Sequence, residues 1–209
     1  MTTMMNKPTT IIEDVVIPAI NIQRMTVEVE SWAGSSLIIH RFGEKSRKEI
    51  ADKEGGKAKG PRPKRNPKKE YEASKHLLPD GQLAFPASGF FKGVLDAAIA
   101  IPNVTKTGIR RALYVVGEQG TDLVAIHGKP HMEEGEPVRL SGIGNTVTLR
   151  YRAIVDKWAA TINIEYDADQ ISVEQVTNLV QRAGFSSGLG DWRPSAKNPG
   201  NHGRYKLKE

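Results

Sequence analysis

The sequence predicts an α+β domain with a β-α-β-β-α-β core, and three observations lead to this prediction. Apolar and polar residues alternate in "RMTVEVESW" (24–32) and in "AATINIEYD" (159–167), as they do in strands with one buried face. Apolar residues recur at helical spacing in "ISVEQVTNLVQRAG" (171–184). The chain has 209 residues, of which 38% are hydrophobic, and this is enough for one sizeable core.

The first half of the chain supplies a strand, a helix and two further strands. The strand at 24–32 is followed by the apolar run "LIIH". The segment "QLAFPASGFFKGVLDAAIAIP" (82–102) predicts a short strand and then a helix, with Ser88 as its N-cap. The expected apolar stripe of this helix is Phe91, Leu95 and Ile99. A short basic helical turn in "TKTGIRRALYVVG" then leads to two strands joined at "GEQG".

The last third predicts a hairpin, a helix and a final strand. "NTVTLRYRAIVDKW" alternates as "AATINIEYD" does, so the two should pair with a turn near Asp156-Lys157. In the following helix Ser172 and Gln175 form a capping box, and Gly184 is the expected C′ residue. "RYKLK" is the final strand. This order matches the ferredoxin-like plan, in which both helices cover one sheet face. The free face of strand 146–157 would carry Arg150 and Arg152.

Charge and composition narrow the classes of function. The net charge is +6 and the pI is near 9.5, which is consistent both with an anionic partner such as nucleic acid and with an ordinary basic surface. The absence of cysteine excludes disulfides, thiolate zinc sites and cysteine nucleophiles. No apolar run has the length of a membrane span, and the N-terminus lacks the pattern of a signal peptide. We expect a cytoplasmic protein without a cofactor or metal.

A basic insertion at 43–72 is the first candidate binding region. "GGKAKGPRPKRNPKK" (55–69) holds seven Lys and Arg and no acid, so it predicts a mobile loop that contacts phosphates without reading bases. The preceding "GEKSRKEIADKE" predicts an exposed helix. The candidate residues are Lys45, Arg47, Lys48, Lys57, Lys59, Arg62, Lys64, Arg65, Lys68 and Lys69.

A glycine-rich loop at 184–203 is the second candidate. Its glycines would let backbone N–H groups reach phosphates, and Trp192 could stack on a base; the alternative is a connector whose Trp192 packs on the core. The candidates here are Gly188, Gly190, Trp192, Arg193, Lys197, His202 and Arg204. Further basic candidates are Lys92, Arg110, Arg111, Arg150 and Arg152.

Two sets of histidines are candidates for chemistry. His40 follows an apolar run, and a hydrogen-bonded histidine at the edge of the core is favoured there over a general base. His127 and His131 lie four apart, but Gly128 and Pro130 prevent the helix that a metal site at this spacing would need.

Three segments resemble the RAMP superfamily of CRISPR systems. "FPASGFFKGVLDAA" is similar to the start of its first helix, with Pro86, Ser88, Lys92 and Gly93 as the matching residues. "GFSSGLGDWRPSAKNPGNHGRYKL" resembles its glycine-rich loop, and "EVESWAGSSLIIHRF" its first strand. A group of uncharacterised phage proteins shares this layout. The resemblance implies a ferredoxin-like core that binds single-stranded guide RNA and assembles side by side, and other members cut repeat RNA, often with a histidine.

The combined prediction is an N-terminal arm (1–21) and one RAMP-like domain (22–209) that binds single-stranded nucleic acid, DNA or RNA, without catalysis. Binding would be largely independent of sequence and cooperative, with a homo-oligomer or filament forming along the strand. The expected setting is phage DNA replication or recombination in the cytoplasm of the bacterial host. The alternatives are a CRISPR effector backbone subunit, an endoribonuclease using His40, and a RAMP mimic that inhibits a host defence complex.

Overall fold

The computed structural model describes residues 16–56, 64–133, 136–139 and 147–208, and it has an α+β fold built on antiparallel sheets. The largest sheet has four strands in the order β12-β1-β11-β5, and every neighbouring pair is antiparallel. Its strands are β1 (Ile22–Ser31), β5 (Leu113–Val116), β11 (Ala159–Asp167) and β12 (Tyr205–Leu207). The predicted strands at 24–32, 159–167 and the C-terminus are therefore confirmed.

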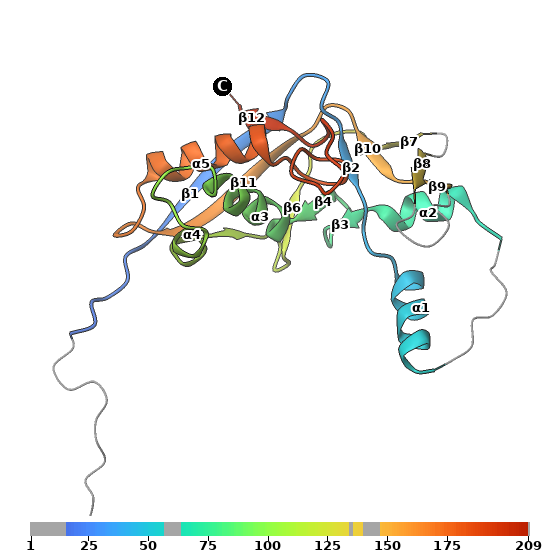
Figure 1. Cartoon of the computed structure of the whole chain (residues 1–209), viewed down its shortest axis with the longest axis horizontal. Helices are drawn as coiled ribbons and strands as arrows, with labels where there is room; N and C mark the ends of the chain where they lie inside the picture. Colours follow the sequence, from blue (N-terminus) through green and yellow to red (C-terminus); the bar gives the residue numbers. More distant parts are fainter. Residues whose placement is uncertain (1–15, 57–63, 134–135, 140–146, 209) are drawn as a thin grey trace, which may run out of the picture.

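Helices α3 (Ala87–Ala98) and α5 (Val173–Ser186) pack against each other and against the buried side chains of this sheet (Figure 1). The capping box of Ser172 and Gln175 is present at the start of α5. Gly184 is not the C′ residue, because α5 continues to Ser186 and has Ser187 as its C-cap. The C′ residue is Gly188, which has a φ of 64°. Gly184 instead lets β12 approach, since a Cβ there would lie 2.1 Å from the Tyr205 carbonyl oxygen.

Three smaller sheets extend the molecule beyond the four-stranded sheet (Figure 1). One has the order β2-β10-β7, with β2 at Leu37–Ile39, β10 at Ala153–Val155 and β7 at His131–Met132. A second has the order β3-β4-β6, with β3 at His76–Leu77, β4 at Leu83–Pro86 and β6 at Leu123–Ala125. The third pairs β8 (Glu136–Arg139) with β9 (Val147–Arg150). The remaining helices are α1 (Glu44–Glu54), α2 (Pro67–Ser74) and α4 (Lys106–Ala112).

The predicted hairpin of 146–157 with 159–167 is wrong. The segment forms two strands, β9 and β10, and β10 pairs with β2 and β7 whereas β11 pairs with β1 and β5. All four residues from Arg152 to Val155 are buried, so the chain enters the interior where a half-buried strand was expected. Consequently Arg152 does not lie on a free sheet face. The strands before and after "GEQG", β5 and β6, likewise belong to different sheets.

Helix α3 begins earlier and is rotated relative to the prediction. Pro86 is its N-cap residue, so Ser88 lies inside the first turn and caps nothing. The buried stripe runs through Phe90 and Val94 and includes the predicted Leu95, whereas Phe91 is half-buried and Ile99 is 65% exposed beyond the helix end. The N-cap lies two residues before the predicted Ser88, because the φ of Pro86 suits the start of a helix and the helix begins at Ala87.

The insertion at 43–72 contains two helices. The predicted exposed helix is α1, and α2 starts at Pro67 after Asn66, whose side chain accepts a hydrogen bond from the Lys69 N–H. Ser74, the last residue of α2, ties the insertion to the core. Its carbonyl accepts from the Arg41 N–H at 2.8 Å, and its hydroxyl accepts from the Ala153 N–H at 2.9 Å. No helix among the described residues is long and apolar enough to cross a membrane.

Candidate nucleic-acid interface

The glycine-rich loop after α5 folds back onto β2 and onto itself. The Asp191 N–H donates to the Ile38 carbonyl at 3.0 Å, and the Leu189 N–H donates to the Gly203 carbonyl at 2.9 Å. The Gly203 N–H donates to the Ser36 carbonyl at 2.8 Å. These amides are bound within the protein. This part of the loop backbone is therefore built into the fold, and these three N–H groups are not free to bind a phosphate.

The glycines are required by these close contacts. A Cβ at Gly190 would lie 2.3 Å from the Ile38 carbonyl oxygen, and one at Gly203 would lie 1.8 Å from the Leu189 carbonyl oxygen. Gly188, Gly190 and Gly203 also have φ values of 64°, 72° and 68°, which disfavour any side chain. We therefore attribute the glycine content to approach of the loop to its own chain, where the sequence predicted approach to phosphates.

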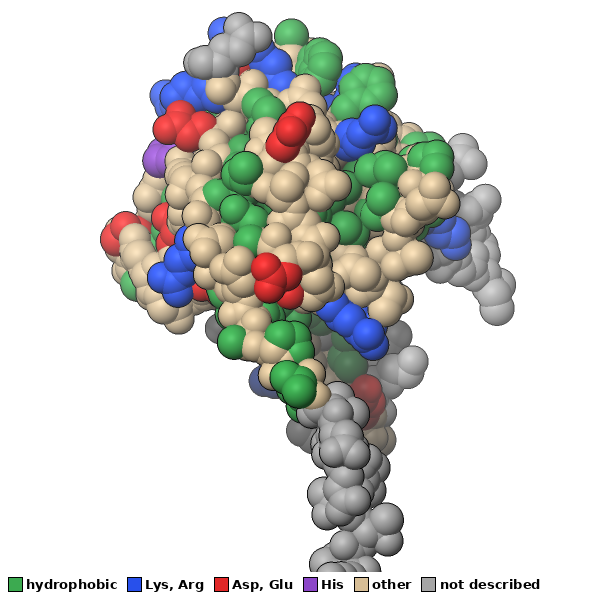
Figure 2. All heavy atoms as spheres, turned by 90° about the vertical axis from the view of Figure 1, so that its left-hand side faces the viewer, with side chains coloured by type: hydrophobic (Ala, Val, Ile, Leu, Met, Phe, Trp, Pro, Cys, Tyr) green, Lys and Arg blue, Asp and Glu red, His purple; other side chains and the backbone are tan. Residues whose placement is uncertain are grey.

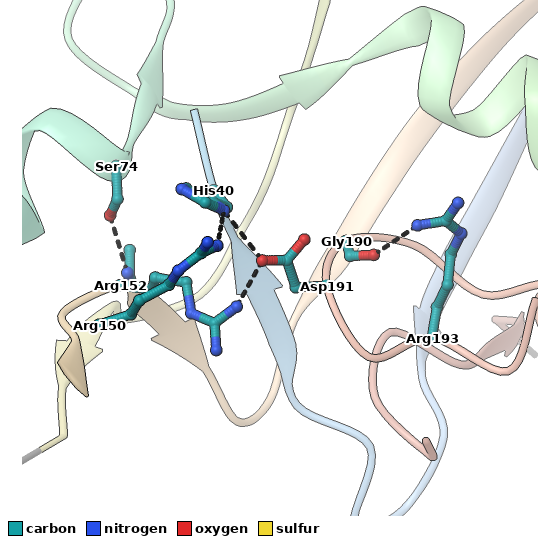
Figure 3. A network of polar contacts seen from close by, with 8 residues as sticks. His40, Ser74, Arg150, Arg152, Gly190, Asp191 and Arg193 are labelled. Atoms are coloured by element: carbon teal, nitrogen blue, oxygen red, sulfur yellow. Dashed lines mark hydrogen bonds and ion pairs between the residues drawn. The ribbon is translucent and has the colours of Figure 1, made fainter. Parts of the chain in front are cut away.

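Asp191 connects this loop to β2 and β10 through its carboxylate (Figure 3). One carboxylate oxygen accepts a hydrogen bond from the guanidinium of Arg152 and lies 3.0 Å from Nδ1 of His40. Arg150 approaches the same His40 nitrogen at 3.4 Å. If His40 Nδ1 carries the proton that bonds Asp191, the other ring nitrogen of a neutral His40 is left as the acceptor.

The electrostatics of this network keep Asp191 ionised. Burial opposes the charged form, but the hydrogen bond and charge of His40 and the charge of Arg152 outweigh it, so the pKa of Asp191 is lowered. The Arg152 side chain is only 3% exposed and its guanidinium lies 5.3 Å from the Trp192 ring centre. Trp192 also packs beside His202, with ring centres 6.0 Å apart. Arg152 and Trp192 thus hold the loop in place.

A pocket of about 210 Å³ lies between this loop, the first turns of α3 and the end of β4. The residues around it that carry chemistry are His40, His76, Lys92, Asp191 and Arg193. Burial lowers the pKa of His76, and the charge of Arg41 lowers it further against the opposing effect of Asp122. His76 is therefore neutral at physiological pH. No group of three or more His, Asp or Glu residues in the described ranges could hold a metal ion.

Two cations border the pocket without a carboxylate partner among the described residues. Lys92 is exposed on α3. Arg193 donates to the Gly190 carbonyl at 2.9 Å and to the Ser195 hydroxyl at 3.1 Å, so neutral groups hold it. Lys197 is exposed on the outer part of the loop. Because no described acid neutralises these cations, the pocket rim is suited to an anionic group.

The basic insertion contributes fewer available cations than predicted. Arg65 is held by Glu70 through two hydrogen bonds and by the Thr148 hydroxyl at 3.0 Å, so it fastens α2 to β9. Lys64, Lys68 and Lys69 are exposed near the start of α2, and Arg47 and Lys48 are exposed on α1. Lys57, Lys59, Arg62 and the side chain of Lys45 lie outside the described residues, as do residues 1–15 of the expected arm.

The other predicted cations are not gathered at the pocket. Arg110 and Arg111 lie in the last turn of α4, at the opposite end of the long axis from α2 and β9 (Figure 1). Figure 2 views that end, where basic side chains alternate with acidic and apolar ones. Arg204 lies between the rings of Trp32 and Phe185. The structure therefore separates the predicted residues into several groups.

The exposed face of the four-stranded sheet is electrostatically balanced. It carries the ion pairs Arg24–Glu165, Lys206–Glu30 and Lys208–Glu28 at 2.7, 3.0 and 3.0 Å. A face with as many carboxylates as cations does not attract a polyanion, so it is a weaker candidate than the pocket.

Comparisons with known proteins add little to this geometry. No protein-family model matches the chain, and no curated protein matches its sequence. Among solved structures, Cmr6 from Pyrococcus furiosus is similar at 12% identity with a TM-score of 0.41, over 90% of this chain and 98% of that one. A likeness of this size carries no functional argument.

Sequence reasoning missed two members of the site. The sequence marks Asp191 only as an interruption of the glycines, and it does not single out His76. An acid inside an otherwise basic, glycine-rich stretch was the available clue to a buried ion pair. No local pattern marks His76, because it reaches the pocket from β3 through tertiary packing.

Proposed function

We propose that the protein binds single-stranded nucleic acid through its phosphate backbone, along a path from the pocket rim to α2. The observation that carries the proposal is the pair of cations around the pocket without carboxylate partners among the described residues, Lys92 and Arg193. The exposed Arg41 continues this set, and its backbone is bonded to Ser74 at the end of α2. The exposed lysines Lys68 and Lys69 lie earlier on the same helix.

The contacts in this path favour binding that does not depend on base sequence. Lysine and arginine on an open surface contact phosphates, whereas base readout needs positioned groups at base edges. Either DNA or RNA can satisfy such contacts. A flexible single strand can follow a path around a pocket more easily than a stiff duplex.

The topology supports a ferredoxin-like, RAMP-like assignment as part of the proposal. The β12-β1-β11-β5 order with α3 and α5 on one face is what a β-α-β-β-α-β plan requires. The glycine-rich loop lies between the last helix and the last strand, as the sequence resemblance implied.

Assembly into a homo-oligomer or filament is proposed from the segment before β1. Val16, Ile17 and Ile20 are 90%, 74% and 63% exposed on a segment that leaves the body (Figure 1). A run of exposed apolar side chains marks an interaction surface, and a second copy of the chain is the proposed partner. Ile17→Asp with Ile20→Asp should lower the mass measured by light scattering; an unchanged mass, or a parent that is already monomeric, would contradict this.

Phage DNA replication or recombination is the setting we propose, on the sequence resemblance alone. Two other settings would involve the same surface, a CRISPR effector subunit and a RAMP mimic. They differ in which molecules would co-purify with the protein. RNA of uniform length would favour a CRISPR effector subunit bound to guide RNA. Capture of an intact host defence complex would favour a RAMP mimic.

The proposal is tested with two double variants that each remove two positive charges. Lys92→Gln with Arg41→Gln removes one cation that lines the pocket and one whose charge acts on His76, a residue of the same pocket. Arg110→Gln with Arg111→Gln acts on α4 at the far end. In fluorescence-anisotropy titrations of dT and U oligomers, the first variant should weaken binding and the second should not. Equal weakening would show unlocalised attraction, and absence of binding by the parent would refute the function.

A second candidate function, RNA cleavage, is favoured by the contact between His40 and Asp191 at the pocket. His40, oriented by Asp191, would accept the proton of a ribose 2′-hydroxyl as that oxygen attacks the adjacent phosphorus. Breakage of the bond from phosphorus to the 5′-oxygen then leaves an alkoxide, which takes a proton from water because His76 is neutral and is not an acid. The hydroxide that forms takes up the proton held by His40. If the protein is not an enzyme, as the sequence predicts, hairpin and linear RNA incubated with it should stay intact. Cleavage that is lost in His40→Ala and absent on 2′-deoxy strands would favour the nuclease.

A further inference from the structure

An aromatic corner, partly exposed, lies where the glycine-rich loop leaves α5 and where it returns to β12. It consists of Trp32, just after β1, and Phe185, in the last turn of α5, whose ring centres are 5.9 Å apart with planes tilted by 60°. Phe185 is 57% exposed, although the buried stripe of α5 lies on another side of the helix. A large ring left in solvent at this position contributes little to the core.

Arg204 completes this aromatic corner. Its guanidinium carbon lies 5.0 Å from the Trp32 ring centre and 4.9 Å from that of Phe185. Nε donates to the Phe185 carbonyl at 3.3 Å, and the Arg204 carbonyl accepts from the Trp32 N–H at 3.0 Å. Among the described residues its two terminal nitrogens make no hydrogen bond and no ion pair. The arginine is thus fixed in place with donors still directed to solvent.

The surroundings of the corner are basic. The last turn of α5, "QRAGFS", contains no acid, and Arg182 is exposed there. A cation with no carboxylate next to an exposed ring is the combination that stacks a base and holds the adjoining phosphate. A protein partner would need acidic groups facing both arginines, whereas a nucleic acid supplies the negative charge and the flat ring together.

We propose that Phe185, Trp32 and Arg204 form a stacking site for one base of a bound single strand. This inference rests on the proposed function and adds a base subsite to it. The corner is joined to the pocket through the backbone pair of Leu189, which lines the pocket, and Gly203, which precedes Arg204. A strand that passes over this pair would place phosphate at the pocket rim and a base on Phe185.

The test compares a dT oligomer with an abasic strand of the same length, which has the same phosphates and no bases. Phe185→Leu keeps an apolar side chain but removes the ring. Stacking of one base is worth about 1–3 kcal/mol, so this variant should bind dT about 5- to 150-fold more weakly. Its affinity for the abasic strand should be unchanged. The matched control is Tyr114→Leu, which removes another exposed ring, 55% exposed on β5.

The outcomes of this binding test separate the stacking site from its alternatives. Selective loss on dT in Phe185→Leu, with Tyr114→Leu like the parent, supports the stacking site. Unchanged dT affinity, equal loss on both strands, or a change in oligomeric mass without loss on dT overturns it. If the parent binds neither strand, the proposed function itself has failed. Trp32→Leu, which removes the other ring of the corner, tests the same site by the same comparison of dT with the abasic strand. Its melting temperature shows whether the variant is still folded.

Discussion

Replacement of Asp191 by Asn should destabilise the protein strongly. The Arg152 side chain is 3% exposed, and Asp191 supplies it with a carboxylate. Breaking a buried ion pair by removing one partner costs about 3–5 kcal/mol. Because Asp191 itself is 33% exposed, water can compensate part of this loss. We therefore expect a loss of about 2–3 kcal/mol in the free energy of unfolding.

The assay is urea unfolding at neutral pH, with thermal melting as a second measurement. For a chain of this size, 2–3 kcal/mol corresponds to a fall in Tm of about 4–12 °C. The control is Glu28→Gln, which removes a carboxylate from the exposed pair with Lys208. Exposed pairs contribute about 0–1 kcal/mol, so the control should melt close to the parent.

The pH dependence provides an independent check on the cause. The folded-state pKa of Asp191 is lowered from its ordinary 3.8, so its stabilising contribution is complete above that value. The contribution is lost as the pH falls through the lowered pKa. The stability difference between parent and Asp191→Asn should therefore shrink below about pH 4. A difference under about 0.5 kcal/mol at pH 7, or one that is unchanged in acid, would refute the reasoning.

Two further predictions concern the loop and the insertion. Gly190→Ala should lower stability by about 1–3 kcal/mol more than Gly81→Ala does, because both have positive φ but only Gly190 would place a Cβ against backbone; equal melting temperatures would contradict this. Lys68→Gln with Lys69→Gln should lower the slope of log affinity against log salt by about 0.7 for each phosphate of a single strand that the variant no longer neutralises. An unchanged slope in titrations from low to high salt would place α2 outside the binding path.

Several short-range patterns were predicted correctly, although the expected Ser88 N-cap of α3 and the expected C′ residue Gly184 of α5 were not. The capping box of Ser172 and Gln175 and the stripe of α5 depend on residues three and four apart, so the sequence displays them directly. The same holds for the alternation in β1. Pairing between strands was less predictable, because a period of two says which residues are buried but not which strand lies alongside.

The break between β9 and β10 shows why the rest could not be predicted. The alternation of "TVTLRYRAIV" continues across both strands, yet Arg152 turns inward because its partner Asp191 lies there. That partner is 39 residues away, and the His40 contact with Asp191 spans 151 residues. A polar residue buried by a distant partner looks like an exposed one in the sequence. The pocket could not be predicted for the same reason, since its residues come from β3, β4, α3, the glycine-rich loop and the position after β2.

The glycine-rich loop shows that one composition can serve either of two purposes. Glycine permits close approach of backbone, but the sequence does not say whether the approaching group is a phosphate or the protein. Here the nearest groups to Gly190 and Gly203 are carbonyl oxygens of Ile38 and Leu189, so the glycines serve the fold. The cationic side chains at the margins of the loop are therefore the strongest candidates for binding an anion. Asp191 neutralises the buried Arg152, and no carboxylate in the described part of the chain pairs with Lys92 or Arg193. The loop therefore determines which cations remain available to bind a strand.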